Sequence, residues 1–168
     1  MTPIDRFAGT LYRALNPVYA REPLSGRGAE MYGGRFNSKG TPALYASLSP
    51  VTALREANQV GVLQPTTLVA YEADVRPVFD TRDAEALAEF GMTPEDLASA
   101  TWRDDMITTG ESATQTFARR LIAAGYAALL VQSFARGSSP TDLNLVLWRW
   151  GASAPTRLVL IDDENRLS

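Results

Sequence analysis

The chain has 168 residues, of which 45% are hydrophobic and 21% charged, and its formal net charge is −3. This length and balance are typical of a globular protein with a sizeable core, so we expect residues 1–168 to form a single domain. The chain contains no cysteine and no histidine. Disulfides, Cys-His or Ser-His nucleophilic sites and His- or Cys-ligated metal centres are therefore excluded. Any chemistry must rest on carboxylates, arginines, hydroxyls, amides and aromatic rings, and we expect no metal.

The distribution of charge points to the kind of ligand. Residues 1–56 carry seven basic and four acidic groups, whereas the remainder carries nine basic and fifteen acidic groups. A positive third in an acidic chain favours a small anionic ligand over nucleic acid. No apolar run is long enough to span a bilayer, and residues 1–9 lack the pattern of a signal peptide. We therefore expect a cytoplasmic protein that does not bind membranes, and the lack of cysteine is compatible with a reducing compartment.

The first predicted element is a short strand. Residues 1–10 are expected to form a loosely held terminal segment. Residues 11–15 then alternate in polarity as strands do, with Arg13 on the polar side. A single arginine at such a place is most often a surface charge, so its position alone does not assign a function.

Two glycine-rich segments follow, at residues 24–28 and 33–37. Glycine lets the backbone approach a ligand closely and adopt positive φ, so both segments are predicted to be loops. Arg35 lies in the second loop, and its planar guanidinium suits a phosphate or a carboxylate. A structural turn accounts for the glycines equally well.

A strand and a helix are predicted directly after these loops. Residues 42–47 read as a short strand that carries Tyr45. Ser49 is expected to cap a helix that has Pro50 at its first position and carries Glu56. An arginine, a tyrosine and a glutamate thus follow one another on a loop, a strand and a helix. A solvated surface glutamate is the alternative interpretation of Glu56.

The remaining elements follow from periodicity and capping signals. Strands are predicted at residues 66–75, 126–131, 143–150 and 156–161, with 78–80 extending or following the first of them. Helices are predicted at residues 83–90, 93–100 and 113–124, with Ser112 as the cap of the last and Gly91 and Gly125 as stop signals. Residues 102–110 are expected to be irregular, and their acidic pair Asp104-Asp105 to be a solvated loop.

Three polar residues stand out at the ends or within these elements. Gln115 lies in the first turn of the helix at 113–124, where free backbone amides can face a ligand, although a plain capping role is the alternative. Ser133 follows a buried strand, at a place where sites are often built. Asn144 is the odd polar residue of an apolar strand.

Strands and helices are mixed without regular βαβ alternation. A doubly wound parallel sheet is therefore disfavoured, and we expect an α+β fold with a mixed or mainly antiparallel sheet and flanking helices.

A series of motifs runs in order through nearly the whole chain, from Leu11 to Trp148. They are Tyr12-Arg13, Leu24-Ser25-Gly26, Gly28-Ala29, Gly33-Gly34-Arg35-Phe36-Asn37, Pro42, Tyr45-Ala46-Ser47, Ala53, Glu56, Trp102, Thr114-Gln115, Ser133 and Asn144-Leu145-Val146-Leu147. In this order they resemble the RES family of bacterial toxins, named for an arginine, a glutamate and a serine in its active site. Phe36 stands where that family usually has tryptophan. The resemblance implies a fold similar to ADP-ribosyltransferases, with an NAD-binding cleft between sheet halves.

The resemblance also implies an activity. The chain is expected to be the toxin of a type II toxin–antitoxin system that cleaves the nicotinamide–ribose bond of NAD⁺, with Glu56, Arg35 and Ser133 as catalytic residues. Glu56 would stabilise the positive charge that develops on the ribose. Ser133 would orient the substrate or the attacking group, since nothing nearby could deprotonate it to make a nucleophile.

The substrate-binding residues that the resemblance implies are Arg13, Gly33, Gly34, Arg35, Tyr45, Gln115 and Asn144. The two arginines and the backbone N–H groups of the glycines would hold the pyrophosphate. Tyr45 would stack on or wall the nicotinamide ring. Gln115 and Asn144 are secondary candidates.

The acceptor of ADP-ribose stays open between water, phosphate and a protein side chain. The last of these would make the chain a mono-ADP-ribosyltransferase. A non-catalytic dinucleotide-binding module and an RNA-processing toxin are further alternatives, the latter disfavoured by the acidic C-terminal two-thirds. The resemblance implies one protein partner, a cognate antitoxin with a helix-turn-helix region that covers or plugs the cleft.

Overall fold

A computed structural model describes residues 2–58 and 63–167, so Met1 and Ser168, the ends of the predicted domain, lie outside the described residues. These residues form a mixed α+β fold in which helices flank a seven-stranded mixed sheet, as predicted. The strands are β1 (Phe7–Leu15), β2 (Leu44–Ser47), β3 (Thr67–Val75), β4 (Val78–Asp80), β5 (Ala128–Gln132), β6 (Leu143–Leu147) and β7 (Thr156–Leu160). The helical elements are η1 (Pro17–Tyr19), α1 (Arg27–Tyr32), α2 (Pro50–Ala57), α3 (Ala84–Glu89), α4 (Pro94–Leu97), α5 (Trp102–Thr109) and α6 (Ala113–Ala123).

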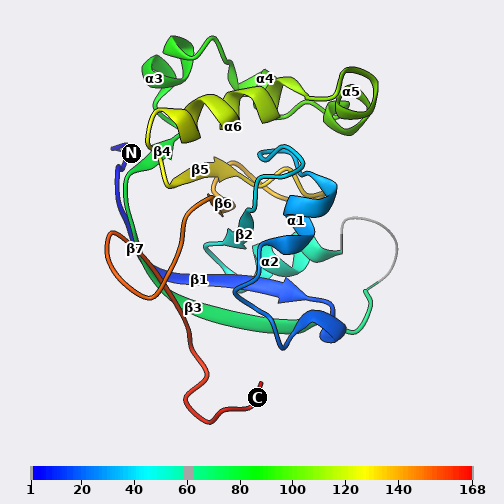
Figure 1. Ribbon diagram of the computed structural model, residues 1–168, viewed down its shortest axis with the longest axis vertical. Coiled ribbons are helices and arrows are strands. Elements are labelled where there is room, and N and C mark those ends of the chain that lie inside the picture. Colours follow the sequence, from blue (N-terminus) through cyan, green and yellow to red (C-terminus); the bar gives the residue numbers. More distant parts are fainter. Residues whose placement is uncertain (1, 59–62, 168) are drawn as a thin grey trace.

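The sheet is divided into two halves that meet at one residue pair. Its order is β4-β5-β6-β2-β1-β3-β7, with β4 and β5 parallel and all other neighbours antiparallel. β1 pairs with β3 along its whole length but with β2 only through Tyr12 and Ser47. In Figure 1, β1 and β3 run below β2, β5 and β6, so the two halves of the sheet lie in separate layers. The end of β1 that carries Arg13 therefore diverges from β2.

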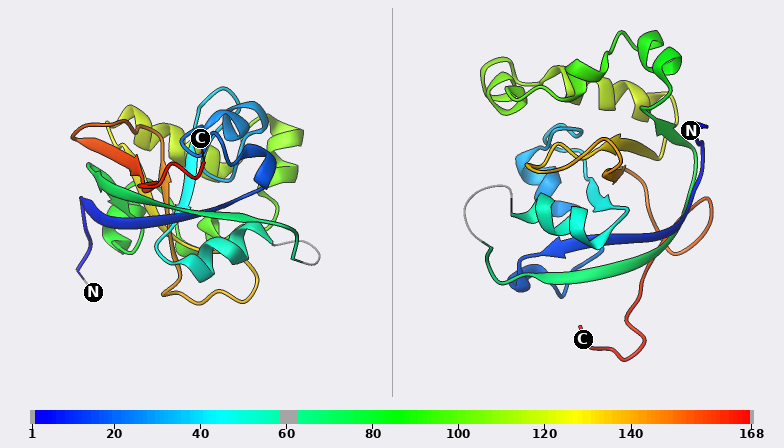
Figure 2. Two further views of the ribbon diagram at one scale, coloured as in Figure 1. Left: turned by 90° about the horizontal axis from the view of Figure 1, so that it is seen from below. Right: turned by 180° about the vertical axis from the view of Figure 1, so that it is seen from behind.

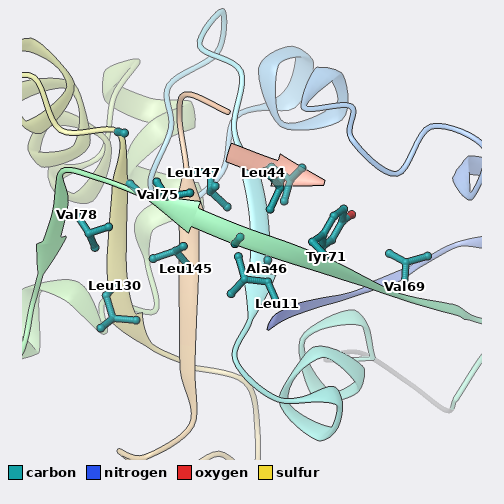
Figure 3. Packing of buried hydrophobic residues seen from close by; sticks show 14 of the residues in the cluster. Leu11, Leu44, Ala46, Val69, Tyr71, Val75, Val78, Leu130, Leu145 and Leu147 are labelled. Carbon is teal, nitrogen blue, oxygen red and sulfur yellow. The ribbon is translucent and has the colours of Figure 1, made fainter. Parts of the chain in front are cut away.

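One hydrophobic core fills the space between the two halves. Figure 3 shows side chains of β3 facing those of β2, β5 and β6 across this space. Tyr71 is fully buried there, and its hydroxyl donates a hydrogen bond to the carbonyl oxygen of Pro23. The core thereby also fixes the segment that leads into α1.

A second core lies on the other face of the β5–β6 half, beneath α3, α4 and α6 (Figures 1 and 2). Phe79 is its aromatic centre, with edge-on contacts to Phe90, Phe117 and Tyr126 at centroid distances of 5.4, 5.7 and 5.3 Å. The apolar face of α6 packs on it through Phe117 and Leu121.

The capping signals correctly located the helix starts. The side chains of Ser49, Asp83, Thr93 and Ser112 each accept a hydrogen bond from a backbone N–H of the turn they cap. Each such bond satisfies a donor that the helix leaves unpaired. Strand and helix bounds otherwise differ from the predictions mainly at their ends. The last predicted strand residues 148–150 lie outside β6, and α4 ends at Leu97 instead of residue 100.

Two predictions near the N-terminus were wrong. The segment at residues 1–10 is not loose throughout, because β1 begins at Phe7 and pairs with Val75 of β3. The segment at residues 24–28 is not a loop throughout, because Arg27 begins α1. The glycines hid this helix, whose short length gives it no clear apolar periodicity.

The prediction that residues 102–110 are irregular was also wrong. They form α5, which ends at Gly110 in the left-handed conformation. The acidic pair Asp104-Asp105 lies in its first turn, where the positive end of the helix dipole stabilises negative charge. Only Met106 of this helix is buried, so the hydrophobic pattern that predicts helices is missing.

None of the helices within residues 2–58 and 63–167 combines the length and the apolar character needed to cross a membrane.

Glu111 ties the second glycine-rich loop to α6. Its carboxylate accepts hydrogen bonds from Ser38, Thr116 and Arg119, at 2.7, 2.6 and 3.0 Å. The Arg119 guanidinium, assisted by the two hydroxyls, lowers the pKa of Glu111 from 4.5 to about 2. A carboxyl whose pKa is lowered by folding stabilises the fold above its unfolded pKa, and the contribution is lost as the pH falls through the folded value.

We therefore predict that Glu111→Gln lowers the thermal unfolding midpoint at pH 7 by a few degrees. The difference from the wild type should shrink as the pH falls from 4.5 towards 2, because the wild-type carboxyl then becomes protonated. Thermal denaturation followed by circular dichroism across this range is the measurement. Glu85→Gln, on the exposed face of α3, is the control. A difference that stays constant with pH would contradict this role.

Candidate functional site

A two-lobed cleft lies where β1 and β2 diverge. The smaller cavity, of about 220 Å³, is lined by residues of β1, β2 and α2, among them Tyr12, Arg13 and Ser47. The larger cavity, of about 450 Å³, is lined by the second glycine-rich loop, the start of α5 and the segment after β5. Tyr45, Glu56 and Asn144 line both cavities, which makes them the junction between the lobes.

Glu56 reaches this junction from α2. Ser49 caps the helix by accepting a hydrogen bond from the backbone N–H of Thr52 at 3.1 Å. Thr52 and Ala53 are buried where α2 packs on β1 and β2. Glu56 lies one helical turn after Thr52, on the same face of the helix, and so projects into the cleft. The cap and this packing set the position of the carboxylate.

Ser133 holds the Glu56 carboxylate. Its hydroxyl donates to Glu56 Oε1 at 2.5 Å and accepts hydrogen bonds from the N–H of Ala135 and the hydroxyl of Ser138, at 3.2 and 3.1 Å. Ser133 is 1% exposed and lines neither cavity. Its proton is directed at Glu56, so the expectation that no proton acceptor lies near this hydroxyl was wrong, and the serine acts through that carboxylate.

Asp142 connects the helix that carries Glu56 to the loop that carries Ser133. Its Oδ1 accepts from the hydroxyl of Thr52 at 3.0 Å, and its backbone oxygen accepts from the N–H of Ser133 at 2.7 Å. Its Oδ2 accepts from the N–H of Ser139 at 2.7 Å, closing the loop on itself. One residue therefore sets the distance between Ser133 and Glu56. The sequence analysis missed it, although an aspartate in a Ser-Pro-Thr turn is a signal of side-chain-to-backbone bonding.

Arg13 lines the smaller cavity. One terminal nitrogen, Nη1, donates to the carbonyl oxygens of Pro23 and Ser25, at 3.2 and 3.3 Å. Since carbonyls carry no net charge, these bonds fix the guanidinium without neutralising it.

Arg35 is held in a similar way in the larger cavity. Its Nη1 donates to the carbonyl oxygens of Leu97 and Ser99, at 3.1 and 2.6 Å. Burial lowers the pKa of Arg35 from its ordinary value, and the nearby Glu56 charge opposes this shift. Arginine is basic enough to stay a cation despite such a shift, so a desolvated positive charge faces the cavity across from the carboxylate.

The hydroxyl of Tyr45 is built into the second glycine-rich loop. It donates to Asn37 Oδ1 at 2.7 Å and accepts from the N–H of Phe36 at 3.0 Å. Burial raises the pKa of Tyr45 well above its ordinary value, so the phenol is neutral. At Gly34 a Cβ atom would lie 2.5 Å from this hydroxyl, so only glycine fits there. Gly33 next to it has a φ of 74°, and both glycines line the larger cavity.

Gln115 lies outside the cleft lining, beneath the same loop. It is fully buried, forms a capping box with Ser112, and donates from Nε2 to the carbonyl oxygens of Gly34 and Asn37, at 2.9 and 3.1 Å. These contacts agree with the capping interpretation of Gln115. The side chain also supports the second glycine-rich loop.

Asn144 is fixed on the opposite wall. Its Oδ1 accepts from the Ser47 hydroxyl at 2.6 Å, across the paired strands β6 and β2. Its amide NH₂ group is the donor that remains at the junction of the two lobes.

Several lining residues were not predicted as site residues. The larger cavity also contains Trp102, Arg103 and Phe134, of which the first two begin α5. Because residues 102–110 were expected to be irregular, nothing placed them beside the cleft. Among the residues that the structure describes, no group of three or more acidic side chains could hold a metal ion.

The sequence matches the family model described as "RES domain" over residues 10–167. No curated protein matches the chain. The matched region includes every residue that lines the cleft. The chain therefore belongs to the RES-domain family, a membership consistent with a toxin-like, NAD-related domain.

Proposed function

We propose that this protein is a toxin that cleaves the nicotinamide–ribose bond of NAD⁺. The observation that carries the proposal is the Glu56 carboxylate, oriented by a 2.5 Å hydrogen bond from Ser133 and placed between two arginine-bearing cavities. The choice of NAD⁺ as the substrate is supported by membership of the RES-domain family.

The chemistry suits the groups present. Nicotinamide leaves NAD⁺ as a neutral molecule, so departure needs little acid catalysis. The barrier lies in the positive charge that develops on the ribose, and a fixed carboxylate stabilises that charge. Ser133 fixes one oxygen of Glu56 through a charge-assisted hydrogen bond, which is stronger than a bond between neutral groups.

The cations of the cleft bind the other end of the substrate. Arg13 and Arg35 are held by carbonyl oxygens, which carry no net charge and therefore do not act as counter-ions. Their remaining N–H groups are the pyrophosphate ligands in this proposal. Tyr45, which is neutral and rigid, forms the wall at the reacting bond.

The acceptor follows from what reaches the ribose once nicotinamide departs. Water gives hydrolysis, phosphate gives phosphorolysis, and a protein side chain gives ADP-ribosylation. Degradation of NAD⁺ by water or phosphate is the activity proposed, with transfer to a protein as the alternative.

We predict that the purified protein, freed of any partner, releases nicotinamide from NAD⁺ and that Glu56→Gln lowers the rate at least about 100-fold, the order of magnitude lost with one charge-stabilising group. Free nicotinamide is measured by chromatography, with and without phosphate. A rate that rises with phosphate identifies it as the acceptor.

Glu89→Gln, an exposed change in α3, is the matched control and should leave the rate unchanged. Unfolding midpoints show that each variant is folded. Wild-type rates in Glu56→Gln would contradict the proposed role of the carboxylate. If the wild type releases no nicotinamide, labelled NAD⁺ in cell extract tests transfer to a protein.

A second prediction concerns the positioning of Glu56. Ser133→Ala should lower kcat for nicotinamide release about 10- to 100-fold, since a hydrogen bond to a charged group contributes ~1.5–3 kcal/mol. KM should change little, because Ser133 lines neither cavity.

Ser138→Ala is the control for this experiment. It removes a hydroxyl that bonds to Ser133 and leaves the bond to Glu56 in place. A loss confined to KM, or equal losses in both variants, would show that Ser133 does not act through Glu56.

A further inference from the structure

Four side chains of the larger cavity form a continuous alternation of aromatic rings and guanidinium groups. The Arg35 guanidinium carbon lies 4.9 Å from the centroid of Phe134 and 5.9 Å from that of Trp102. The Arg103 guanidinium carbon lies 4.8 Å from the Trp102 centroid. All four residues line the cavity. We call this group, Phe134–Arg35–Trp102–Arg103, the ring–guanidinium ladder.

The ladder joins three distant parts of the chain. Phe134 follows β5, Arg35 belongs to the second glycine-rich loop, and Trp102 and Arg103 begin α5. Arg35 ties them together, since its Nη1 bonds to the carbonyls of Leu97 and Ser99 just before α5. The rings are therefore held in place by a side chain that itself faces the cavity.

The two guanidinium groups of the ladder have no carboxylate paired with them among the described residues. Within residues 2–58 and 63–167, the ion pairs formed between side chains involve other arginines. Both guanidinium groups lie beside the same Trp102 ring. Burial is the main cause that lowers the pKa of Arg35, and repulsion from the Arg103 charge lowers it further. An anion between them would relieve this repulsion.

Flat rings beside paired cations are the features that bind a base joined to phosphates. Stacking of a base on an aromatic side chain is worth ~1–3 kcal/mol, and guanidinium groups bind phosphate oxygens in pairs. The larger cavity, of about 450 Å³, also has about twice the volume of the smaller one, of about 220 Å³.

We propose that the larger cavity is a subsite for a nucleoside diphosphate, in which the Trp102 and Phe134 rings contact the base and Arg103 joins Arg35 on the phosphates. The orientation of the dinucleotide in this assignment rests on the proposed function. The nicotinamide end then lies in the smaller cavity, with the reacting bond at Glu56 in the junction. This orientation narrows the pyrophosphate ligands named above to Arg35, joined by Arg103, and leaves Arg13 beside the nicotinamide end. The protein therefore selects the full dinucleotide over nicotinamide mononucleotide, which lacks the base that the rings contact and one of the two phosphates.

Binding of ADP, measured by isothermal titration calorimetry, tests the subsite without any turnover. Trp102→Leu and Arg103→Ala should each weaken ADP binding about tenfold or more. Trp102→Phe should keep most of the affinity, because it retains an aromatic ring. Ribose 5-phosphate, which has no base, should bind more weakly than ADP and should not respond to Trp102→Leu.

Arg21→Ala is the control for loss of charge, since Arg21 is exposed and lines neither cavity. It should leave ADP affinity unchanged. Arg103 is also exposed, so Arg103→Ala remains informative even if Trp102→Leu fails to fold. In turnover, the KM for NAD⁺ should rise in both ladder variants, and nicotinamide mononucleotide should be a poorer substrate than NAD⁺.

The outcomes separate the subsite from the activity. ADP binding that depends on the ladder, without nicotinamide release, would sustain the subsite and contradict NAD⁺ cleavage. Release that depends on Glu56, with ADP affinity and KM unchanged in both folded ladder variants, would overturn the subsite and leave the activity standing. Equal turnover of nicotinamide mononucleotide and NAD⁺ would also overturn it.

Discussion

The single pairing of Tyr12 with Ser47 is the constraint on which the cleft depends. If β1 and β2 paired along their length, the sheet would be continuous and its polar edge residues would be covered. Because they part after one pair, the next residue of β1, Arg13, faces open space, and the polar ends of β2 and β6 line the same space. The core between the halves, shown in Figure 3, keeps them apart and so keeps the cleft open.

The position of the Glu56 carboxylate depends on a second constraint, the connection between α2 and the loop after β5. Glu56 lies on α2 and Ser133 follows β5, and Asp142 bonds to both of these segments. The side chain of Asp142 fixes α2, while its backbone oxygen fixes Ser133. A shift of either segment would change the Glu56–Ser133 distance, so the position of the carboxylate and the packing are set by the same residue.

Local signals in the sequence predicted the parts of this structure that local forces determine. Ser49 and Ser112 marked helix starts correctly because a cap bonds within its own turn. The helix α5 was missed because only Met106 of it is buried, which leaves no apolar stripe to detect. The segment just before it is held by Arg35, which bonds to carbonyls 62 and 64 residues away. Glu56 and Ser133 were named from a family resemblance, but their mutual contact spans 77 residues and no periodicity encodes it. Trp102 and Arg103 were left out of the predicted site because α5, the helix that they begin, was not predicted.

The placement of charge explains how an acidic protein presents a positive cleft. Most ion pairs in the part of the chain that the structure describes match an arginine with a nearby surface carboxylate, as in Arg6–Asp74 and Arg166–Glu164. In the cleft, Arg13 and Arg35 bond instead to carbonyl oxygens, which orient a guanidinium but leave its charge in place. Low-dielectric walls then concentrate that field at the cavity. Glu56 offsets only part of it, so the field of the cleft favours an anionic ligand over a neutral or cationic one.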